Sequence, residues 1–284
     1  MLLHCAGRTL DLSRPRVMGV LNITPDSFSD GGQLLTDGRP RIDRVLRRAA
    51  KMLGGGAAIL DVGGESTRPG AVPVSEQEEI DRVAPVVENL VSRFDVVVSV
   101  DTSRPCVMRE VTAHGAGMIN DVRALRCEGA LEAVRGSDVA LCLMHMLGDP
   151  RTMQDEPHYD DVCAEVQAFL LERARVCESS GIVRERIVID PGFGFGKTLA
   201  HNLALLQGLC TLTACGYPVL VGLSRKSMIG RITGQTVTGR LAGGLALATL
   251  AAYAGARIVR THDVAATRDA LKVVAAIDER AMTR

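Results

Sequence analysis

Two carboxylates and one amide follow short apolar runs in this sequence, and their chemistry suits a flat ligand that carries adjacent N–H donors. Asp101 and Asp190 each end a run of mostly β-branched residues, and Asn120 follows Met118 and Ile119. A carboxylate accepts two parallel N–H bonds from an amidine-like edge, as it does from a guanidinium. These residue types therefore predict a binding site for a hydrogen-bonding heterocycle.

Basic side chains near the end of the sequence supply the opposite charge. Lys226 lies just beyond the seventh apolar run, and Arg260 and His262 follow the eighth. Side chains of this kind bind phosphate groups. Together the two sets predict a ligand with a hydrogen-bonding ring at one end and an anionic group at the other.

Eight apolar runs are available to position these residues, and each ends at a polar residue or a glycine turn. The runs are Val17–Leu21, Ala58–Leu60, Val96–Val100, Met118–Ile119, Val139–Met144, Ile187–Ile189, Val219–Leu223 and Arg257–Val259. They are continuously apolar rather than alternating, which is typical of parallel strands that are covered by helices. Eight strands and the helices between them in about 250 residues predict a (β/α)8 TIM barrel, an α/β fold with a closed parallel sheet. An open doubly wound sheet is the alternative.

The segments between the runs have helical patterns. Apolar residues between Ile42 and Leu53 recur at helical spacing, and Ser75-Glu76-Gln77-Glu78 forms a capping box. Further helices are expected at Pro105–His114, Tyr159–Ser180, Ala200–Cys215, Thr238–Ala254 and Val264–Ala281, with a short one between Asp121 and Ser137. We see no linker or repeat, so residues 1–284 are expected to form a single domain.

A barrel brings the ends of all eight strands to one rim, where active sites of this fold lie. We therefore expect a polar pocket formed by Asn22, Asp101, Asn120, Asp190, Ser224, Lys226, Arg260 and His262. Two polar, glycine-ended loops, 22–32 and 63–70, are long enough to close over a ligand there.

Composition excludes several other classes of function. The 33 acidic residues balance the 33 basic ones, so no charge favours nucleic acid or an anionic membrane. Eight scattered cysteines without a C-x-x-C pair predict reduced thiols in a cytoplasmic protein, and no Cys/His cluster suits zinc. No run is long enough to span a bilayer. The glycines after Asp190 match neither a P-loop nor a dinucleotide fingerprint, because Pro191 and Lys197 occupy required glycine positions.

Eight ordered blocks resemble the dihydropteroate synthase family over nearly the whole chain, from Val17 to Leu271. They read MGVLNITPDSFSDGG, DVGGESTRPGA, SVDTSRP, INDV, MHMLGDPRTMQ, IDPGFGFGK, GLSRKSMIG and VRTHDV. The resemblance implies a (β/α)8 enzyme of folate biosynthesis. Such an enzyme joins 4-aminobenzoate to 6-hydroxymethyl-7,8-dihydropterin diphosphate and releases pyrophosphate and 7,8-dihydropteroate.

The resemblance also implies roles for particular residues. The pterin is expected to be held by Asp101, Asn120, Asp190 and Lys226, in a pocket lined by Met144, Phe195 and Gly222. Arg260 is expected to stack on the ring and, with His262 and Asn22, to bind the diphosphate, while Asn22 takes Mg2+. The aminobenzoate site and the loop over the pyrophosphate are expected to contain Phe28, Thr67, Arg68, Pro69 and Ser224, with Lys226 contacting both substrates. The catalytic set is then Asp101, Asp190, Lys226, Arg260 and His262.

Further expectations concern the mechanism, inhibition and assembly. No covalent enzyme nucleophile is required, because an aromatic amine is neutral and nucleophilic at pH 7. We expect inhibition by sulfonamides, which mimic aminobenzoate. The segment Gly243–Ala256 is apolar on nearly every side and must be buried all round, either within the barrel or in a homodimer. The alternative functions are a pterin-binding methyltransferase-type barrel, which handles no diphosphate, and a pterin-binding relative without catalysis.

Overall fold

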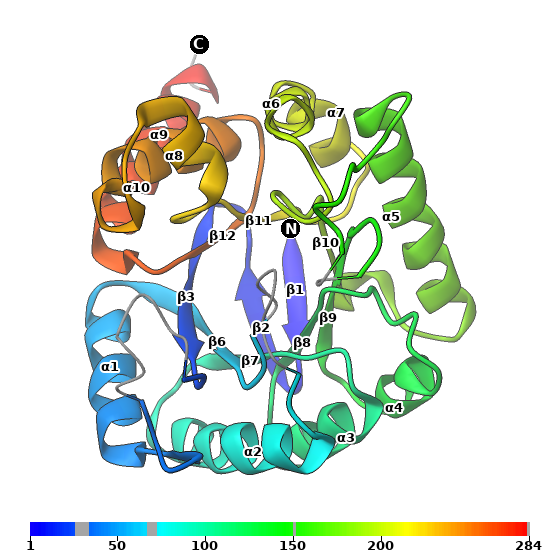
Figure 1. The fold of residues 1–284 in the computed structure, drawn as a ribbon, viewed down its shortest axis with the longest axis vertical. Coiled ribbons are helices and arrows are strands. Elements are labelled where there is room, and N and C mark those ends of the chain that lie inside the picture. The colour runs from blue at the N-terminus through cyan, green and yellow to red at the C-terminus, as the bar shows by residue number, and fades with distance from the viewer. Residues whose placement is uncertain (26–33, 67–72, 150–151, 283–284) are drawn as a thin grey trace.

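The structure is a computed structural model that describes residues 1–25, 34–66, 73–149 and 152–282. Eight parallel strands form one sheet in which sequential strands are neighbours (Figure 1). They are β3 (Arg16–Asn22), β6 (Ala57–Gly63), β7 (Val97–Asp101), β8 (Met118–Asp121), β9 (Ala140–Met144), β10 (Ile187–Asp190), β11 (Leu220–Gly222) and β12 (Ile258–Thr261). A parallel bridge between Ile189 and Val219 joins β10 to β11 and closes the barrel. The predicted (β/α)8 barrel is confirmed, and the open sheet is excluded.

Helices surround the barrel on its outside (Figure 1). They are α1 (Ile42–Gly54), α2 (Glu76–Arg93), α3 (Pro105–Ala113), α4 (Ala130–Arg135), α5 (Val162–Ser179), α6 (Leu199–Gln207), α7 (Leu209–Thr213), α8 (Ser227–Thr233), α9 (Leu241–Tyr253) and α10 (Val264–Met282). The capping box at Ser75 is present, with reciprocal hydrogen bonds between Ser75 and Glu78 at the start of α2. No helix in the described part of the chain is long and apolar enough to cross a membrane.

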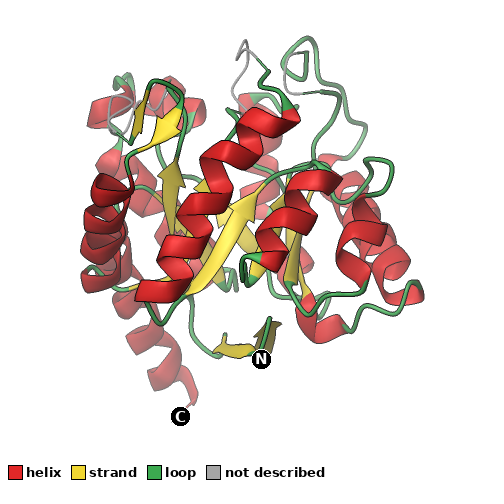
Figure 2. Ribbon diagram, turned by 90° about the horizontal axis from the view of Figure 1, so that it is seen from below, coloured by secondary structure: helices red, strands yellow, loops and turns green. Residues whose placement is uncertain are grey.

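An antiparallel hairpin of β1 (Leu2–Cys5) and β2 (Arg8–Asp11) covers the end of the barrel where the strands begin (Figure 2). A second short hairpin, β4 (Leu35–Thr36) with β5 (Arg39–Pro40), lies at the opposite end. Leu3, Cys5 and Leu12 are fully buried against the barrel interior. The first hairpin therefore closes one end of the barrel and leaves the other for a ligand.

Side chains along each strand point alternately into and out of the barrel. This separates an inner apolar core from an outer one and fixes where the polar residues at the strand ends lie. One side chain from each strand forms an apolar layer inside the barrel: Met18, Ile59, Val97, Met118, Ala140, Val188, Leu220 and Ile258. The intervening side chains pack outward against the helices. Because successive side chains of a strand point to opposite faces, the residue two positions after each layer member points inward again. Asp61, Asn120, Asp190, Gly222 and Arg260 occupy these positions.

Several elements differ from the sequence-based expectations. Gly208 divides the expected helix 200–215 into α6 and α7, and α8 and both hairpins were not predicted. Of the two explanations for Gly243–Ala256, burial within one chain is not found, and burial in a homodimer stays a prediction. Leu250 and Tyr253 of α9 are 55% and 64% exposed, because the helix packs against α8 and α10 with one face only.

Candidate functional site

A cavity of about 650 Å³ lies at the carboxyl ends of the barrel strands. All predicted site residues within the described part of the chain line it: Asn22, Asp101, Asn120, Met144, Asp190, Phe195, Gly222, Ser224, Lys226, Arg260 and His262. The other four, Phe28, Thr67, Arg68 and Pro69, lie outside the described residues. Residues that are 240 positions apart in the chain thus meet in one pocket, as the strand-end pattern predicted.

Arg260 joins two carboxylates from neighbouring strands at the base of this pocket. Its Nε donates to Oδ2 of Asp61 at 2.6 Å, and its Nη2 donates to Oδ2 of Asp101 at 3.0 Å. Asp61 is fully buried and also accepts a hydrogen bond from Nδ2 of Asn120 at 3.2 Å. These two carboxylates raise the pKa of the Arg260 guanidinium against the effect of its burial, so Arg260 stays charged.

Asp61 was not among the predicted site residues, although the sequence placed it at the end of a strand. It does not line the cavity, but it contacts two residues that do. Its position is the inward one next to Ile59, where an apolar residue is the usual choice in a packed barrel. A charged residue at a core-facing strand position is the signal that would have identified it.

Burial shifts the protonation of the carboxylates towards the neutral form. It raises the pKa of Asp101 to about 7, against the opposing effect of Arg260. It raises the pKa of Asp190 to about 6, while the Gly192 N–H and the Lys226 ammonium oppose the rise. Burial thus favours the neutral form of both carboxyls, and a ligand that presents N–H donors favours their ionised form.

The glycine-rich loop after β10 forms one wall of the cavity and is shaped by close contacts. Gly192 has φ +66°, and a Cβ at this position would lie 1.9 Å from the carbonyl oxygen of His145. Its N–H donates to Oδ1 of Asp190 at 2.7 Å, which fixes the carboxylate. Only glycine fits here, both for the backbone conformation and for the space.

Lys226 reaches this loop from the segment after β11. Its Nζ donates to the Phe193 carbonyl at 2.6 Å and lies 4.1 Å from the centre of the Phe195 ring. Burial lowers the pKa of Lys226 to about 8, and the Asp190 carboxylate opposes this. Lys226 thus brings a buried positive charge to the ring-binding part of the pocket.

A hydroxyl and an imidazole meet on the side of the cavity formed by β11 and β12. Ser224 Oγ lies 3.1 Å from the ring nitrogen Nδ1 of His262. It also accepts a hydrogen bond from the backbone N–H of His262 at 3.3 Å. The neighbouring Arg225 donates to both carboxylate oxygens of Asp263 at 2.8 and 3.2 Å. The bidentate pair joins the two segments and so fixes the Ser224–His262 contact.

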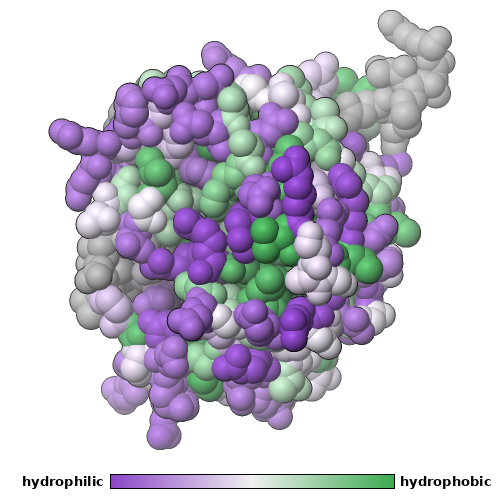
Figure 3. Space-filling model, turned by 90° about the vertical axis from the view of Figure 1, so that its right-hand side faces the viewer, coloured by the Kyte–Doolittle hydropathy of each residue, from purple (hydrophilic) through white to green (hydrophobic). Residues whose placement is uncertain are grey.

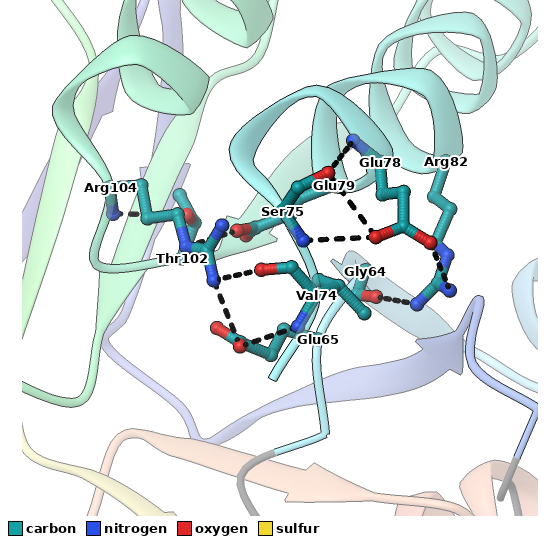
Figure 4. A network of polar contacts seen from close by, with 9 residues as sticks. All are labelled: Gly64, Glu65, Val74, Ser75, Glu78, Glu79, Arg82, Thr102 and Arg104. Atoms are coloured by element: carbon teal, nitrogen blue, oxygen red, sulfur yellow. Dashed lines mark hydrogen bonds and ion pairs between the residues drawn. The ribbon is translucent and has the colours of Figure 1, made fainter. Parts of the chain in front are cut away.

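The segment after β6 is held to the start of α2 by a network of charged residues (Figure 4). Arg104 donates to Glu65 at 3.0 Å and to the Val74 carbonyl at 2.6 Å, and its Nε lies 3.2 Å from Glu79. Arg82 donates to the Gly64 carbonyl at 2.9 Å. Since Glu65 lines the cavity, these contacts fix its edge on this side.

The donors available for a metal ion in the pocket are few. Among the described residues there is no group of three or more His, Cys, Asp or Glu side chains that could hold one. Asn22 lines the cavity with a neutral amide oxygen, on the same side as Asp101. Mg2+ often takes one or two protein ligands and completes its shell with water and substrate phosphates. Among the described residues, the donors thus suit a metal ion that is bound together with a diphosphate rather than one held by these side chains alone.

Comparison with known proteins agrees with this geometry. The family described as pterin binding enzyme matches residues 18–262. The fold and the site thus define the class, a pterin-binding (β/α)8 enzyme.

The dihydropteroate synthase of Escherichia coli K12 is 52% identical over 276 residues, which cover 97% of this chain and 96% of that protein. The Yersinia pestis dihydropteroate synthase, solved with a sulfonamide drug, superposes with a TM-score of 0.93 at 49% identity and covers 99% of this chain and 100% of that one. The Xanthomonas albilineans dihydropteroate synthase, solved with 4-aminobenzoic acid, has a TM-score of 0.89 at 52% identity, with 98% of each chain covered. The chain belongs to the dihydropteroate synthase family.

Proposed function

We propose that this protein condenses 6-hydroxymethyl-7,8-dihydropterin diphosphate with 4-aminobenzoate to form 7,8-dihydropteroate and pyrophosphate. The observation that carries the proposal is the meeting of Asp101, Asn120 and Asp190 with Lys226, Arg260 and His262 in one cavity. The first three suit the N–H edge of a pterin ring, and the last three suit anionic and carbonyl groups. The family relationship supports the same reaction.

The residues of the pocket match the charges that develop in this reaction. Breaking the C–O bond leaves positive charge on the pterin methylene and negative charge on the departing diphosphate. Asp101 and Asp190 stabilise the ring as it becomes electron-poor, and Arg260 and His262 stabilise the leaving group. Arg260 holds Asp61 and Asp101 through Nε and Nη2, which leaves Nη1 to bind the diphosphate.

We propose Asn22 as the protein ligand of a Mg2+ ion that enters with the diphosphate. The ion would neutralise charge on the leaving group as the bond breaks. Asn22 lines the cavity, whose basic lining residues are Arg225, Lys226, Arg231, Arg240 and Arg260. Asn22→Ala should weaken Mg2+-dependent binding of the diphosphate and leave binding of the bare pterin ring unchanged.

The aminobenzoate site is proposed to lie beside Ser224 and Lys226. Phe28, Thr67 and Pro69, which are predicted for the same site, and Arg68, which is predicted for the diphosphate, lie outside the described residues. Ser224 and its partner His262 resemble a nucleophile and base, but the amine of aminobenzoate attacks the methylene directly. No covalent intermediate is therefore expected. Mass spectrometry of the enzyme during turnover should detect no pterin adduct, and a sulfonamide should compete with aminobenzoate.

We further propose a homodimer formed through α9 and α10, in a cytoplasmic protein whose eight cysteines are all unpaired. Large apolar side chains are exposed on these two helices, which pack on each other: Leu241, Leu250, Tyr253, Val273 and Ile277. The face that carries α5 shows hydrophilic residues around a central apolar area (Figure 3). Sedimentation should give a dimer, and Leu250→Glu should shift the equilibrium towards monomer.

Pyrophosphate release from the pterin diphosphate, measured with Mg2+ in the presence and absence of 4-aminobenzoate, tests the proposed reaction. We expect release that depends on aminobenzoate and yields dihydropteroate. Pterin binding without release would instead indicate a non-catalytic relative.

A further inference from the structure

The backbone of the glycine-rich loop after β10 is fixed by side chains at every carbonyl from residue 192 to residue 198. Two lysines account for three of these contacts. Lys226 donates to Phe193, and Lys197 donates to both Gly192 and Phe195 at 3.0 Å. The remaining carbonyls accept from Gln154, Tyr159 and Asn202. The loop is therefore held rigidly, although three of its residues are glycine.

Lys197 differs from Lys226 in that it is buried behind the loop and does not line the cavity. It is 3% exposed, and its Nζ lies 2.9 Å from Nδ1 of His145. Burial lowers the pKa of His145 to about 3, so its ring is neutral and Nδ1 accepts a hydrogen bond. The three N–H groups of a Lys197 ammonium thus face four acceptors: His145 Nδ1, the carbonyls of Gly192 and Phe195 at 3.0 Å, and the His145 carbonyl at 3.4 Å.

We propose that Lys197 is a positioning residue for pterin binding, whose buried ammonium fixes the Phe195 wall and the Asp190 carboxylate. The first effect runs through the Phe195 carbonyl, which places a ring that lines the cavity. The second runs through Gly192, whose carbonyl binds Lys197 and whose N–H binds Asp190. This inference rests on the proposed function, because it requires that the pocket binds a pterin.

The charges around the pocket support a role beyond packing. Asp61, Asp101 and Asp190 are the acidic side chains of this part of the pocket, and Arg260 and Lys226 are two basic side chains that interact with them. Lys197 is a third, and its charge lowers the pKa of Asp190. In turn, burial lowers the pKa of Lys197 to about 7, with Asp190 opposing and Lys226 adding to that effect. Other charged groups also act on this cluster: Glu79 and Asp121 act on Asp101, and Arg126 acts on His145.

The first test compares Lys197→Met with Lys51→Met, which removes an exposed lysine of α1. Binding of 6-hydroxymethylpterin is measured by calorimetry between pH 5 and 8. Lys197→Met should raise the dissociation constant about tenfold, as expected for loss of one charged hydrogen-bond network. It should also move the acid limb of binding to higher pH, because Asp190 loses a neighbouring positive charge. Lys51→Met should change neither.

A purely structural lysine would leave the position of the acid limb unchanged. A folded Lys197→Met variant with the wild-type acid limb would therefore overturn the proposal, whatever its dissociation constant. Failure of the wild-type protein itself to bind the pterin would refute the proposed function instead.

A second measurement needs no variant at position 197. The chain has only four lysines, Lys51, Lys197, Lys226 and Lys272, so 13Cε-lysine spectra resolve each one. Variants of the other three assign the signals. If charged Lys197 favours pterin binding, saturation with pterin must raise the pKa of Lys197 by reciprocity. An identical titration of Lys197 with and without 6-hydroxymethylpterin would exclude the proposed coupling.

Discussion

Replacing Asp61 by asparagine tests whether its buried carboxylate fixes Arg260 and Asn120 in the pocket. Asp61 is fully buried, and its carboxylate accepts from Arg260 at 2.6 Å and from Asn120 at 3.2 Å. Removing one partner of a buried ion pair costs about 3–5 kcal/mol. Arg260 keeps its second partner, Asp101, so we expect a loss near the lower limit, about 3 kcal/mol in the free energy of unfolding.

The same change should reduce turnover. Without Asp61 the guanidinium and the Asn120 amide are no longer fixed, and a displacement of catalytic groups by about 1 Å can cost roughly 100-fold in rate. Guanidinium chloride unfolding measures the stability, and pyrophosphate release measures the activity.

The matched control is Asp43→Asn, which also removes an Asp–Arg pair. Asp43 accepts from Arg47 at 2.7 Å on the surface of α1, where solvent screens the interaction. We expect the control to leave the unfolding midpoint and the turnover unchanged. If Asp61→Asn costs no more than Asp43→Asn in both assays, the reasoning about the buried network is refuted.

Three further predictions follow from the same structure. Gly192→Ala should abolish pterin binding, because the added Cβ would lie 1.9 Å from the His145 carbonyl oxygen. Gly136→Ala, which has open space around the added Cβ, should bind the pterin as the wild type does. Equal affinities of the two variants in calorimetry would contradict this. Burial raises the pKa of Glu79 to about 7, so its contribution to stability is present below its unfolded pKa and lost as pH rises through 7. Relative to that of the wild type, the free energy of unfolding of Glu79→Gln should therefore rise between pH 4.5 and 7, by up to about 3 kcal/mol. A difference that does not change with pH would disprove the burial effect. Pterin affinity should increase with pH between 6 and 7, as Asp190 and Asp101 ionise; a flat binding profile would show that the N–H edge does not bind these carboxylates.

The fold and the polar members of the pocket were accessible from the sequence because both follow from the pattern of strands, whereas Met144, Phe195 and Gly222 came from the family resemblance. Each apolar run is long enough to define a strand, and parallel strands bring their last residues to one rim. Asp101, Asn120 and Asp190 could therefore be assigned to one pocket without knowledge of any contact. The roles implied for these residues by the family resemblance stay predictions.

Other features depend on packing between distant segments, which a sequence pattern does not contain. Asp61 supports Arg260 across 199 positions of the chain, and Lys197 meets His145 across 52. Nothing in the local sequence distinguishes Lys197 from an exposed lysine after a turn. Likewise, the uniform apolar character of α9 indicated complete burial, but the chain alone leaves Leu250 and Tyr253 exposed.

The central claim is that carboxylates at the strand ends bind the N–H edge of a pterin, and equilibrium binding to Asp190→Asn tests it most directly. Calorimetry with 6-hydroxymethylpterin should show at least about a tenfold loss of affinity for Asp190→Asn, the effect of a lost charge-assisted hydrogen bond. The exposed Asp155→Asn variant should bind as the wild type does. Equal affinity of the wild-type protein and a folded Asp190→Asn variant would contradict the account.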